Sequence, residues 1–411
     1  NVSEYGIDLK LNFPRILMPF GTEKIIPKRM IPSTSISAGF SKQRNIGLDK
    51  ENFTGGISYN WSPKRHNSVK FDLLNAQFVR NLNPNNYFNV YTSSYDELNG
   101  IGKDYNENPI NWGTTPEEQI RKDLTIPNGT TGFTSDVLNN KTALLPGDPQ
   151  YKDVESIEER RVRLTENDFI LATSYTFTKT TKKDLADNTF YQFKTNIESA
   201  GTLLSAISSL GNLPKNANGN YEIFNLEYSE YVKTEFDYIK HWDFGKEKVL
   251  AVRSFFGIAI PFGNSNYIPF SRSYYAGGSN DNRAWQPYSL GPGSTNAVND
   301  FNEANMKIAF SAEYRFKVFG DVKGAIFADA GNIWNVLDNV IDEKAKFSGV
   351  NDLAEIALGS GFGLRYDLSF FVIRLDLGFK TYNPAHEKGD RWFKEYNFGH
   401  SVLNFGINYP F

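Results

Sequence analysis

Along most of the chain, apolar and polar residues alternate one by one. In the first stretch, Tyr5, Ile7 and Leu9 fall on one face and Asp8 and Lys10 on the other. Successive side chains of a β-strand point to opposite faces, so this period of two predicts a strand with one apolar face. The pattern recurs in about thirteen stretches, over residues 5–13, 35–40, 53–61, 69–73, 169–177, 191–198, 232–238, 248–260, 307–316, 323–330, 356–365, 371–380 and 403–411.

The lengths and spacing of these strands predict an all-β antiparallel transmembrane β-barrel over residues 1–411. Many strands approach the roughly 9–11 residues that cross a bilayer at a tilt, and short and long connections alternate. The longest interruption, residues 81–166, is rich in Asn, Pro, Gly and Thr and is predicted as a surface loop insert. Only Val154 to Leu164 has a helical pattern within it. Thr202 to Leu210 is predicted as a second short helix.

The apolar faces could meet lipid in a barrel or each other in a soluble sandwich. The polar faces mix Gly, Ser and Asn with charges of both signs, and aromatic residues gather near strand ends, as they do at a membrane interface. Mean hydropathy is -0.46, and no run approaches the roughly 20 apolar residues of a membrane helix. A barrel remains compatible because half of each strand faces a polar lumen. The last residue, Phe411, ends an apolar face and favours the membrane barrel.

Composition excludes several other classes of protein. The chain has no Cys, four His and a net charge of -3 with interspersed signs. It therefore offers no thiolate site, no spaced set of zinc ligands and no basic surface for nucleic acid. No Ser or acidic residue stands in a recognisable catalytic-nucleophile motif, and no Gly-rich phosphate-binding loop precedes a helix. We expect no cofactor, no metal, no nucleic-acid partner and no enzyme, although a lipase or protease carried by a barrel stays open as an alternative.

A long loop over residues 261–305 interrupts the strand pattern and carries the densest candidate chemistry. Residues 274–294 hold four Gly, two Pro, three Tyr, one Trp and a single Arg, Arg283. Gly and Pro at this density do not belong to a regular element, and a solvated linker needs few large side chains. Long loops in compact domains are usually functional. We predict a functional loop, with an ordinary surface loop as the alternative.

The loop and the strands after it resemble the outer-membrane assembly factor superfamily of BamA and TamA, most closely its TamL-like branch in Bacteroidota. The resemblance extends from Tyr267 to Phe411. Its motifs are Gly277-Gly278-Ser279, the loop tip Arg283-Ala284-Trp285, the continuation Ser289-Leu290-Gly291-Pro292-Gly293-Ser294, and the strand end Ala328-Asp329-Ala330-Gly331-Asn332-Ile333-Trp334.

This resemblance implies a barrel of sixteen strands with the loop after the eleventh. Eight predicted strands precede the loop here, so we expect three more strands, periplasmic POTRA repeats and a signal or lipoprotein segment upstream of Asn1. The implied function is to insert or export outer-membrane or surface proteins through a lateral seam of the barrel. Implied partners are outer-membrane lipid, client proteins, and periplasmic or inner-membrane assembly proteins. A passive pore or transporter, and a soluble carbohydrate-binding or surface protein, are the alternatives.

The same loop yields the candidate site. An Arg inside a barrel needs anionic partners because an unpaired buried charge is costly. Glu313 and Asp329 lie on the inward faces of the two strands after the loop, so we predict that Arg283 points into the lumen and pairs with both, as the resemblance also implies. Alternatively, Asp329 is a turn residue and Glu313 pairs with a neighbouring cation.

The C-terminal strand is the second candidate feature. Phe405, Ile407, Tyr409 and Phe411 alternate along it and are predicted to share one face, which resembles the terminal signal by which outer-membrane barrels are recognised.

Overall fold

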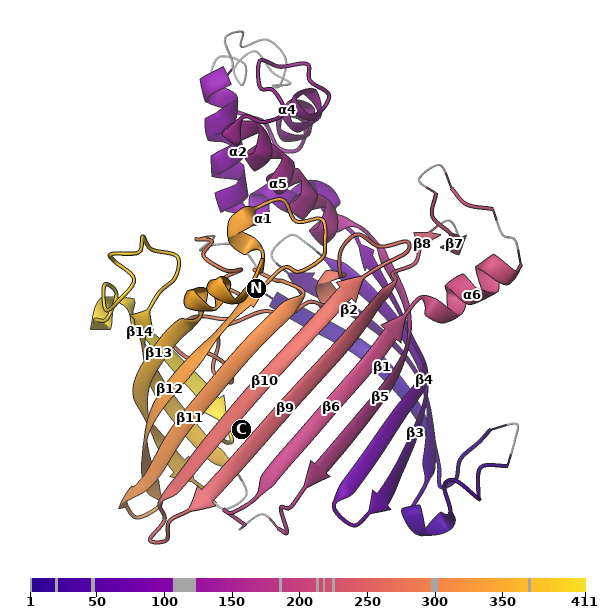
Figure 1. Ribbon diagram of the computed structural model, residues 1–411, viewed down its shortest axis with the longest axis vertical. Helices are drawn as coiled ribbons and strands as arrows, with labels where there is room; N and C mark the ends of the chain where they lie inside the picture. The colour runs from indigo at the N-terminus through magenta and orange to yellow at the C-terminus, as the bar shows by residue number, and fades with distance from the viewer. Residues whose placement is uncertain are drawn as a thin grey trace.

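The computed structural model describes residues 2–18, 21–45, 49–105, 123–184, 187–211, 214–216, 219–223, 226–296, 302–368 and 371–411. In these residues thirteen strands form one antiparallel sheet in sequence order, which curls into a barrel wall of tilted strands (Figure 1). The strands are β1 (Val2–Phe13), β2 (Ser33–Asn45), β3 (Lys50–Lys64), β4 (Asn67–Asn81), β5 (Asp168–Thr180), β6 (Tyr191–Ala200), β9 (Tyr231–Asp243), β10 (Val249–Pro261), β11 (Met306–Phe319), β12 (Val322–Trp334), β13 (Ala357–Asp367), β14 (Val372–Tyr382) and β15 (Val402–Ile407).

The architecture confirms the predicted antiparallel barrel fold. Eight strands of the sheet precede the long loop and five follow it, as the alternation indicates. A separate two-residue hairpin pairs β7 (Glu222–Ile223) with β8 (Leu226–Glu227). Within the described residues, β1 and β15 end the sheet and are not paired with each other. Sixteen strands for the full protein therefore stays a prediction.

The two faces of the wall differ sharply in chemistry. Apolar side chains on the outer face are left uncovered by the sheet itself, and they include Ile7, Leu9, Phe236, Phe310, Ile326, Phe362 and Leu375. Charged side chains on the inner face are buried, among them Glu198, Glu313, Asp329, Arg365 and Asp376. This arrangement suits a wall whose outside contacts hydrocarbon and whose inside is filled by polar groups. No helix in the described part of the chain is long and apolar enough to cross a membrane.

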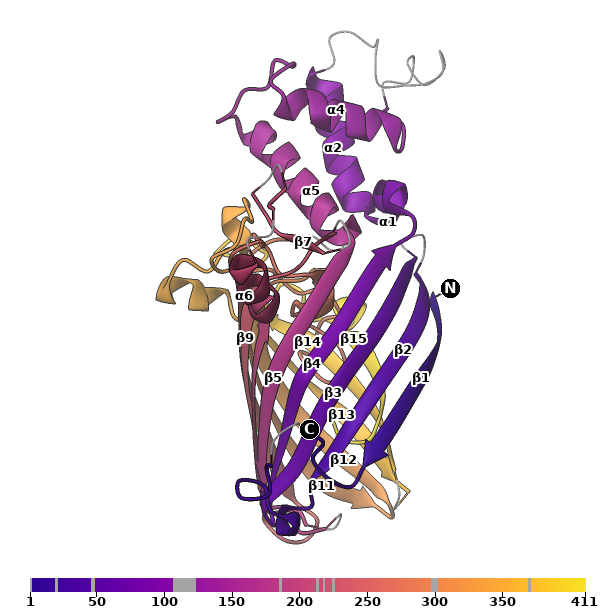
Figure 2. The same ribbon diagram turned by 90° about the vertical axis from the view of Figure 1, so that its right-hand side faces the viewer.

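Helices gather at one end of the barrel, on the side where β4 ends and β5 begins (Figures 1 and 2). Long connections mark the extracellular end of such barrels, so we refer to this end as extracellular. The helices are α1 (Tyr87–Val90), α2 (Thr92–Tyr105), α4 (Asn128–Leu138), α5 (Pro149–Thr165) and α6 (Thr202–Leu210). Short 3-10 turns are η1 (Lys28–Met30), η2 (Pro84–Asn86), η3 (Phe270–Arg272), η4 (Glu343–Ala345), η5 (Val350–Glu355) and η6 (Phe398–His400).

The insert over residues 81–166 is more ordered than the sequence pattern indicates. The predicted helix at Val154 to Leu164 lies inside α5, but α1, α2 and α4 were not predicted, and residues 106–122 of the insert lie outside the described part. Gly, Asn and Thr in α2 and α4 have low helix propensity. Tertiary packing overrides that propensity, because Phe133, Leu98 and Val154 are buried in one apolar core shared by the four helices. We call α1, α2, α4 and α5 the helical cap.

Candidate functional site

The loop between β10 and β11 turns back into the barrel. Its two ends are joined by backbone hydrogen bonds between Tyr274 and Ala304, with N–O distances of 2.8 and 2.9 Å. Beyond this junction, Ala276, Trp285 and Leu290 pack in a buried apolar cluster that includes Ile333 of β12. The loop is therefore folded against the inner wall.

The Gly277-Gly278 pair makes the sharp turn that precedes the tip. Both residues have positive φ, 95° at Gly277 and 101° at Gly278. Gly278 N donates to Trp285 O at 2.8 Å, and Gly277 N donates to the Asp281 carboxylate at 2.7 Å. A Cβ at Gly277 would collide with the carbonyl oxygen of Gln286. The turn thus requires glycine for both its backbone angle and its packing.

Arg283 at the tip is 1% exposed and forms hydrogen-bonded ion pairs with two carboxylates. Its Nε and Nη2 donate to the two Asp329 oxygens at 2.8 and 2.9 Å, a bidentate pair. Its Nη1 donates to Glu313 Oε2 at 2.5 Å and lies 3.6 Å from Asp376 Oδ2. The structure therefore places the three residues as the sequence predicts, with the guanidinium fork matched to Asp329.

The ion cluster extends beyond these three residues. Glu313 also accepts from Arg315 at 2.7 Å and from Arg365 at 2.9 Å. Arg365 in turn lies 2.5 Å from Asp376, which is 3.2 Å from Arg374. Four guanidinium groups therefore surround three carboxylates, so each carboxylate has at least one cation. We call Arg283, Glu313, Arg315, Asp329, Arg365, Arg374 and Asp376 the lumen cluster.

The tip contacts all five strands that follow the loop. Glu313 belongs to β11 and Asp329 to β12. The Asn282 amide donates to Ala357 O of β13 at 3.5 Å, and the Asn404 amide of β15 donates to Arg283 O at 2.8 Å. On β14, Gly378 lies directly under the Arg283 carbonyl. One short segment thus connects the last five of the thirteen strands of the wall.

Gly378 provides a test of this close approach. A Cβ there would overlap the backbone of Arg283, which cannot rotate away. We expect Gly378→Val to displace the tip and to expose the loop to protease in native membranes. Gly55→Val of β3 is the control, because the nearest atom to a Cβ at Gly55 is 3.9 Å away. Equal protease resistance of both variants would contradict the placement of the tip.

The remaining predicted motif residues have structural roles. Ser279 O accepts from Arg374 at 2.7 Å, and Ala284 is fully buried beside Gly359 of β13. Trp285 is buried in the loop cluster, and the ammonium of Lys380 lies 5.7 Å from its ring centroid. The guanidinium carbon of Arg283 lies 3.5 Å from the Phe327 ring centroid, a cation–π contact. The sequence analysis missed several residues that contact the loop tip or belong to the lumen cluster. Their position on the inward face of each strand is the only sequence signal that could have indicated them: Phe327, Arg365, Arg374, Asp376 and Asn404.

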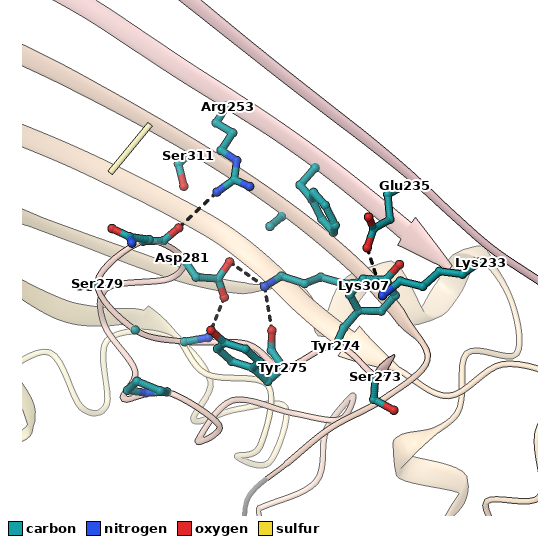
Figure 3. A pocket seen from close by; sticks show the side chains of 16 residues that line it. Lys233, Glu235, Arg253, Ser273, Tyr274, Tyr275, Ser279, Asp281, Lys307 and Ser311 are labelled. Carbon is teal, nitrogen blue, oxygen red and sulfur yellow. Dashed lines mark hydrogen bonds and ion pairs between the residues drawn. The ribbon is translucent and has the colours of Figure 1, made fainter. Parts of the chain in front are cut away.

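A polar cavity of about 400 Å³ separates the loop from β9, β10 and β11 (Figure 3). The cations around it are paired: Lys233 with Glu235 at 3.2 Å, Arg253 with Asp237 at 2.9 Å, and Lys307 with Asp281 at 3.0 Å. Figure 3 shows Lys307 reaching from the wall to Asp281 and to the Tyr275 carbonyl. No cluster of His, Asp and Glu suited to a metal ion occurs in the described residues. The cavity walls therefore hold the loop and carry no evident reactive group.

At its extracellular end, the loop is joined to the helical cap by buried ion pairs. Arg163 of α5 donates to Glu303 at 3.0 Å and also contacts Glu159, and all three side chains are nearly buried. Desolvation raises the pKa of Glu159 above its ordinary value and raises that of nearby Asp338 to about 6. A raised pKa means that the folded state holds the proton more tightly than the unfolded state. Asp338 therefore lowers the stability of the folded state as pH rises from about 4 through 6, and Glu159 acts in the same direction.

The C-terminal residues correct one sequence expectation. Phe405 and Ile407 of β15 face outward and are more than half exposed, but Tyr409 and Phe411 do not continue that face. Asn408 adopts a positive φ of 67° and ends the strand pattern. The guanidinium carbon of Arg315, on the inner face, then lies 4.0 Å from the Tyr409 ring centroid and 5.8 Å from that of Phe411. Alternation in the sequence could not reveal this reversal, because it depends on a single backbone angle.

The reversal predicts different effects for two aromatic residues of the tail. Tyr409→Leu removes a ring that covers a buried guanidinium, so we expect a loss of about 0.5–2 kcal/mol in unfolding free energy. Phe405→Leu replaces one lipid-facing apolar side chain by another and should change it less. Denaturant unfolding in lipid vesicles measures both. A larger effect at Phe405 would indicate that the tail follows the outer face after all.

Comparisons with known proteins agree with this geometry. A family model described as the Omp85 superfamily domain matches residues 28–411. Among solved structures, BamA from Haemophilus ducreyi lacking POTRA domains 1–3 is similar, with a TM-score of 0.53 at 10% identity over 98% of this chain and 61% of that chain. CdiB from Acinetobacter baumannii matches with a TM-score of 0.31 at 10% identity over 99% of this chain and 59% of that chain. A search of curated proteins finds no match. The chain thus spans less than two thirds of either solved chain, and the likeness to BamA shows a shared fold.

Proposed function

The chain belongs to the Omp85 superfamily, and on that premise we propose that it helps to insert or export outer-membrane or surface proteins through a lateral seam of its barrel. Family and fold place it in the bacterial outer membrane. Membership confirms the superfamily that the loop motif indicated, and proteins of this kind are assembly or transport factors in general, not enzymes. The TamL-like branch, its clients and its periplasmic or inner-membrane partners are part of the proposal.

The observation that carries this proposal is the contact of the Arg283 tip with β11 through β15. These contacts hold β11 to β15 together from the inside, and β15 itself is only six residues long, Val402–Ile407. Six residues can form few backbone hydrogen bonds with any neighbouring strand, so a seam at β15 needs few bonds to open. An exposed strand edge is a template for an added strand. A braced wall that ends in a short strand therefore suits pairing of a client strand with β15 once the seam opens.

The same loop argues against a passive pore. Its tip fills the lumen beside β11 to β14, and the cations around the remaining cavity are engaged with carboxylates. The tip thus occupies part of the path that an ion would take along this side of the lumen. We therefore treat a passive pore or transporter as the outcome that the experiment must separate from assembly.

Crosslinking tests the proposal directly, because residues 1–411 contain no Cys and a thiol introduced on β15 is the only one in this part of the protein. The full-length protein carries Leu403→Cys on β15, and a chemically unfolded outer-membrane barrel carries a thiol in its own last strand. We expect a disulfide with the client, and faster client folding into phosphatidylcholine vesicles that contain the protein. Phe310→Cys, on the outer face of β11, is the matched control and should not crosslink.

Two results would contradict the proposal. Equal crosslinking at both positions would indicate nonspecific contact of client with the barrel. Unchanged client folding together with steady single-channel conductance would favour the passive pore.

A further inference from the structure

The loop that joins β14 to β15, residues 383–401, lies against the outer face of the barrel and not over its lumen (Figure 1). We call it the aromatic loop. Its exposed aromatic side chains include Phe398, 76% exposed, and Trp392, 55% exposed. On the wall, Phe379 packs against two of its rings, with centroids 5.1 Å from Tyr396 and 5.4 Å from Phe398. Loops that end in water rarely display so many large apolar groups together.

Hydrogen bonds and ion pairs fix the aromatic loop in this position. Phe393 N donates to Thr381 O at 3.0 Å, and Asn383 N donates to Arg391 O at 2.9 Å. Glu395 accepts from the Asn383 amide at 2.7 Å. These backbone contacts follow the upper end of β14, above Gly378, where pairing with β15 begins. The aromatic display is therefore preformed.

Between the aromatic loop and the wall lies an open groove of about 620 Å³. We call it the outer groove. Its lining includes Ile326, Phe362 and Phe379 of the wall and Tyr396 and Phe398 of the loop. The volume falls within the range of about 300–1,000 Å³ typical of ligand sites. Ile326 and Phe362 are also exposed on the outer face, so the groove is continuous with the lipid-facing surface.

We propose that the outer groove holds an acyl chain of an outer-leaflet membrane lipid, clamped between the aromatic loop and strands β12 to β14. The groove opens at the extracellular end of the hydrocarbon-facing wall, where interfacial aromatic residues contact lipid. A client strand does not fit this place, because the backbone carbonyl of Thr381, near the end of β14, already accepts from Phe393 N of the aromatic loop. The proposal is independent of the assembly function and needs only a barrel in a bilayer.

Fluorescence quenching tests the position of the aromatic loop. The full-length protein is placed in phosphatidylcholine nanodiscs whose acyl chains carry bromine near the glycerol or near the methyl end. We expect Trp392 emission, taken as the difference between wild type and Trp392→Phe, to be quenched most by bromine near the glycerol. Trp334→Phe is the control, because fully buried Trp334 should contribute little quenched emission. Quenching of Trp392 by aqueous iodide but not by brominated lipid would overturn the proposal.

Lipid retention tests the groove itself. After washing in mild detergent, native mass spectrometry should find wild type with a bound phosphatidylcholine and Phe398→Ser without it. Phe310→Ser removes another exposed aromatic from the outer wall, away from the aromatic loop, and should retain the lipid. Heat-modifiable migration confirms that both variants are folded. Loss of lipid in both variants, or a wild-type dimer that Phe398→Ser abolishes, would overturn the proposal, the latter in favour of a second copy of the chain.

Discussion

Replacement of Arg283 by alanine should cost about 3–5 kcal/mol of unfolding free energy, because it leaves a buried carboxylate without its cation. The carboxylate at issue is Asp329. Glu313 keeps Arg315 and Arg365 in the variant, whereas Asp329 has no other ion pair in the described part of the chain. We further expect the loop to become sensitive to protease and client assembly to weaken. Denaturant unfolding in lipid vesicles, proteolysis and the assembly assay measure the three effects.

A second substitution in the Arg283→Ala variant identifies which unpaired carboxylate lowers the unfolding free energy. Asp329→Asn should recover stability in the Arg283→Ala background, since it removes the orphaned charge, and Glu313→Gln should not. Arg283→Lys should rescue only in part because an ammonium lacks the planar fork that fits Asp329. Arg253→Ala is the matched control: its pair with Asp237 is partly solvated and should be worth at most about 1 kcal/mol. Equal losses at Arg253 and Arg283 would refute the special role of the tip.

Placing an arginine on the outer face at mid-height should be nearly as costly. Phe236 is near the middle of β9, faces outward and pairs with Phe256 of β10. We expect Phe236→Arg to cost about 2–4 kcal/mol, since a cation near the bilayer midplane must be desolvated. Asn196→Arg introduces the same side chain at the same height on the inner face, beside Glu235, and should cost much less. Denaturant unfolding in vesicles compares them, and equal losses would indicate that the outer face does not contact lipid.

The alternation of apolar and polar residues revealed the strands of the barrel wall, because this period of two depends only on the residues within each strand. Each strand can be identified from its own residues, and the inward parity of Glu313 and Asp329 follows from the same count. Which inward residues meet depends on strand register and on the path of the loop, and neither is local. Asp376 shows the limit: its sequence context is an ordinary inward position, yet the structure buries it between Arg365 and Arg374.

The helical cap and the C-terminal tail were harder for a related reason. The cap contains residues of low helix propensity, including Gly100 and Gly102 of α2, whose helical state depends on contacts with other helices. Tyr409 fits the outward parity of its strand until the positive φ of Asn408 reverses the chain. In both cases long-range packing or one dihedral angle overrides a correct local pattern.

The contacts of the Arg283 tip should also make β11 to β15 respond to a pulling force as one unit, separate from the earlier strands. Five consecutive strands share one buried anchor, so a force applied to any of them is distributed over all five. Barrels held only by neighbouring ladders can yield one hairpin at a time. Here, pulling Phe411 out of a supported membrane with a cantilever should first extract β11 to β15 as a single unit at high force, and the earlier strands should follow in smaller steps. Arg283→Ala should break that first event into hairpin-sized pieces.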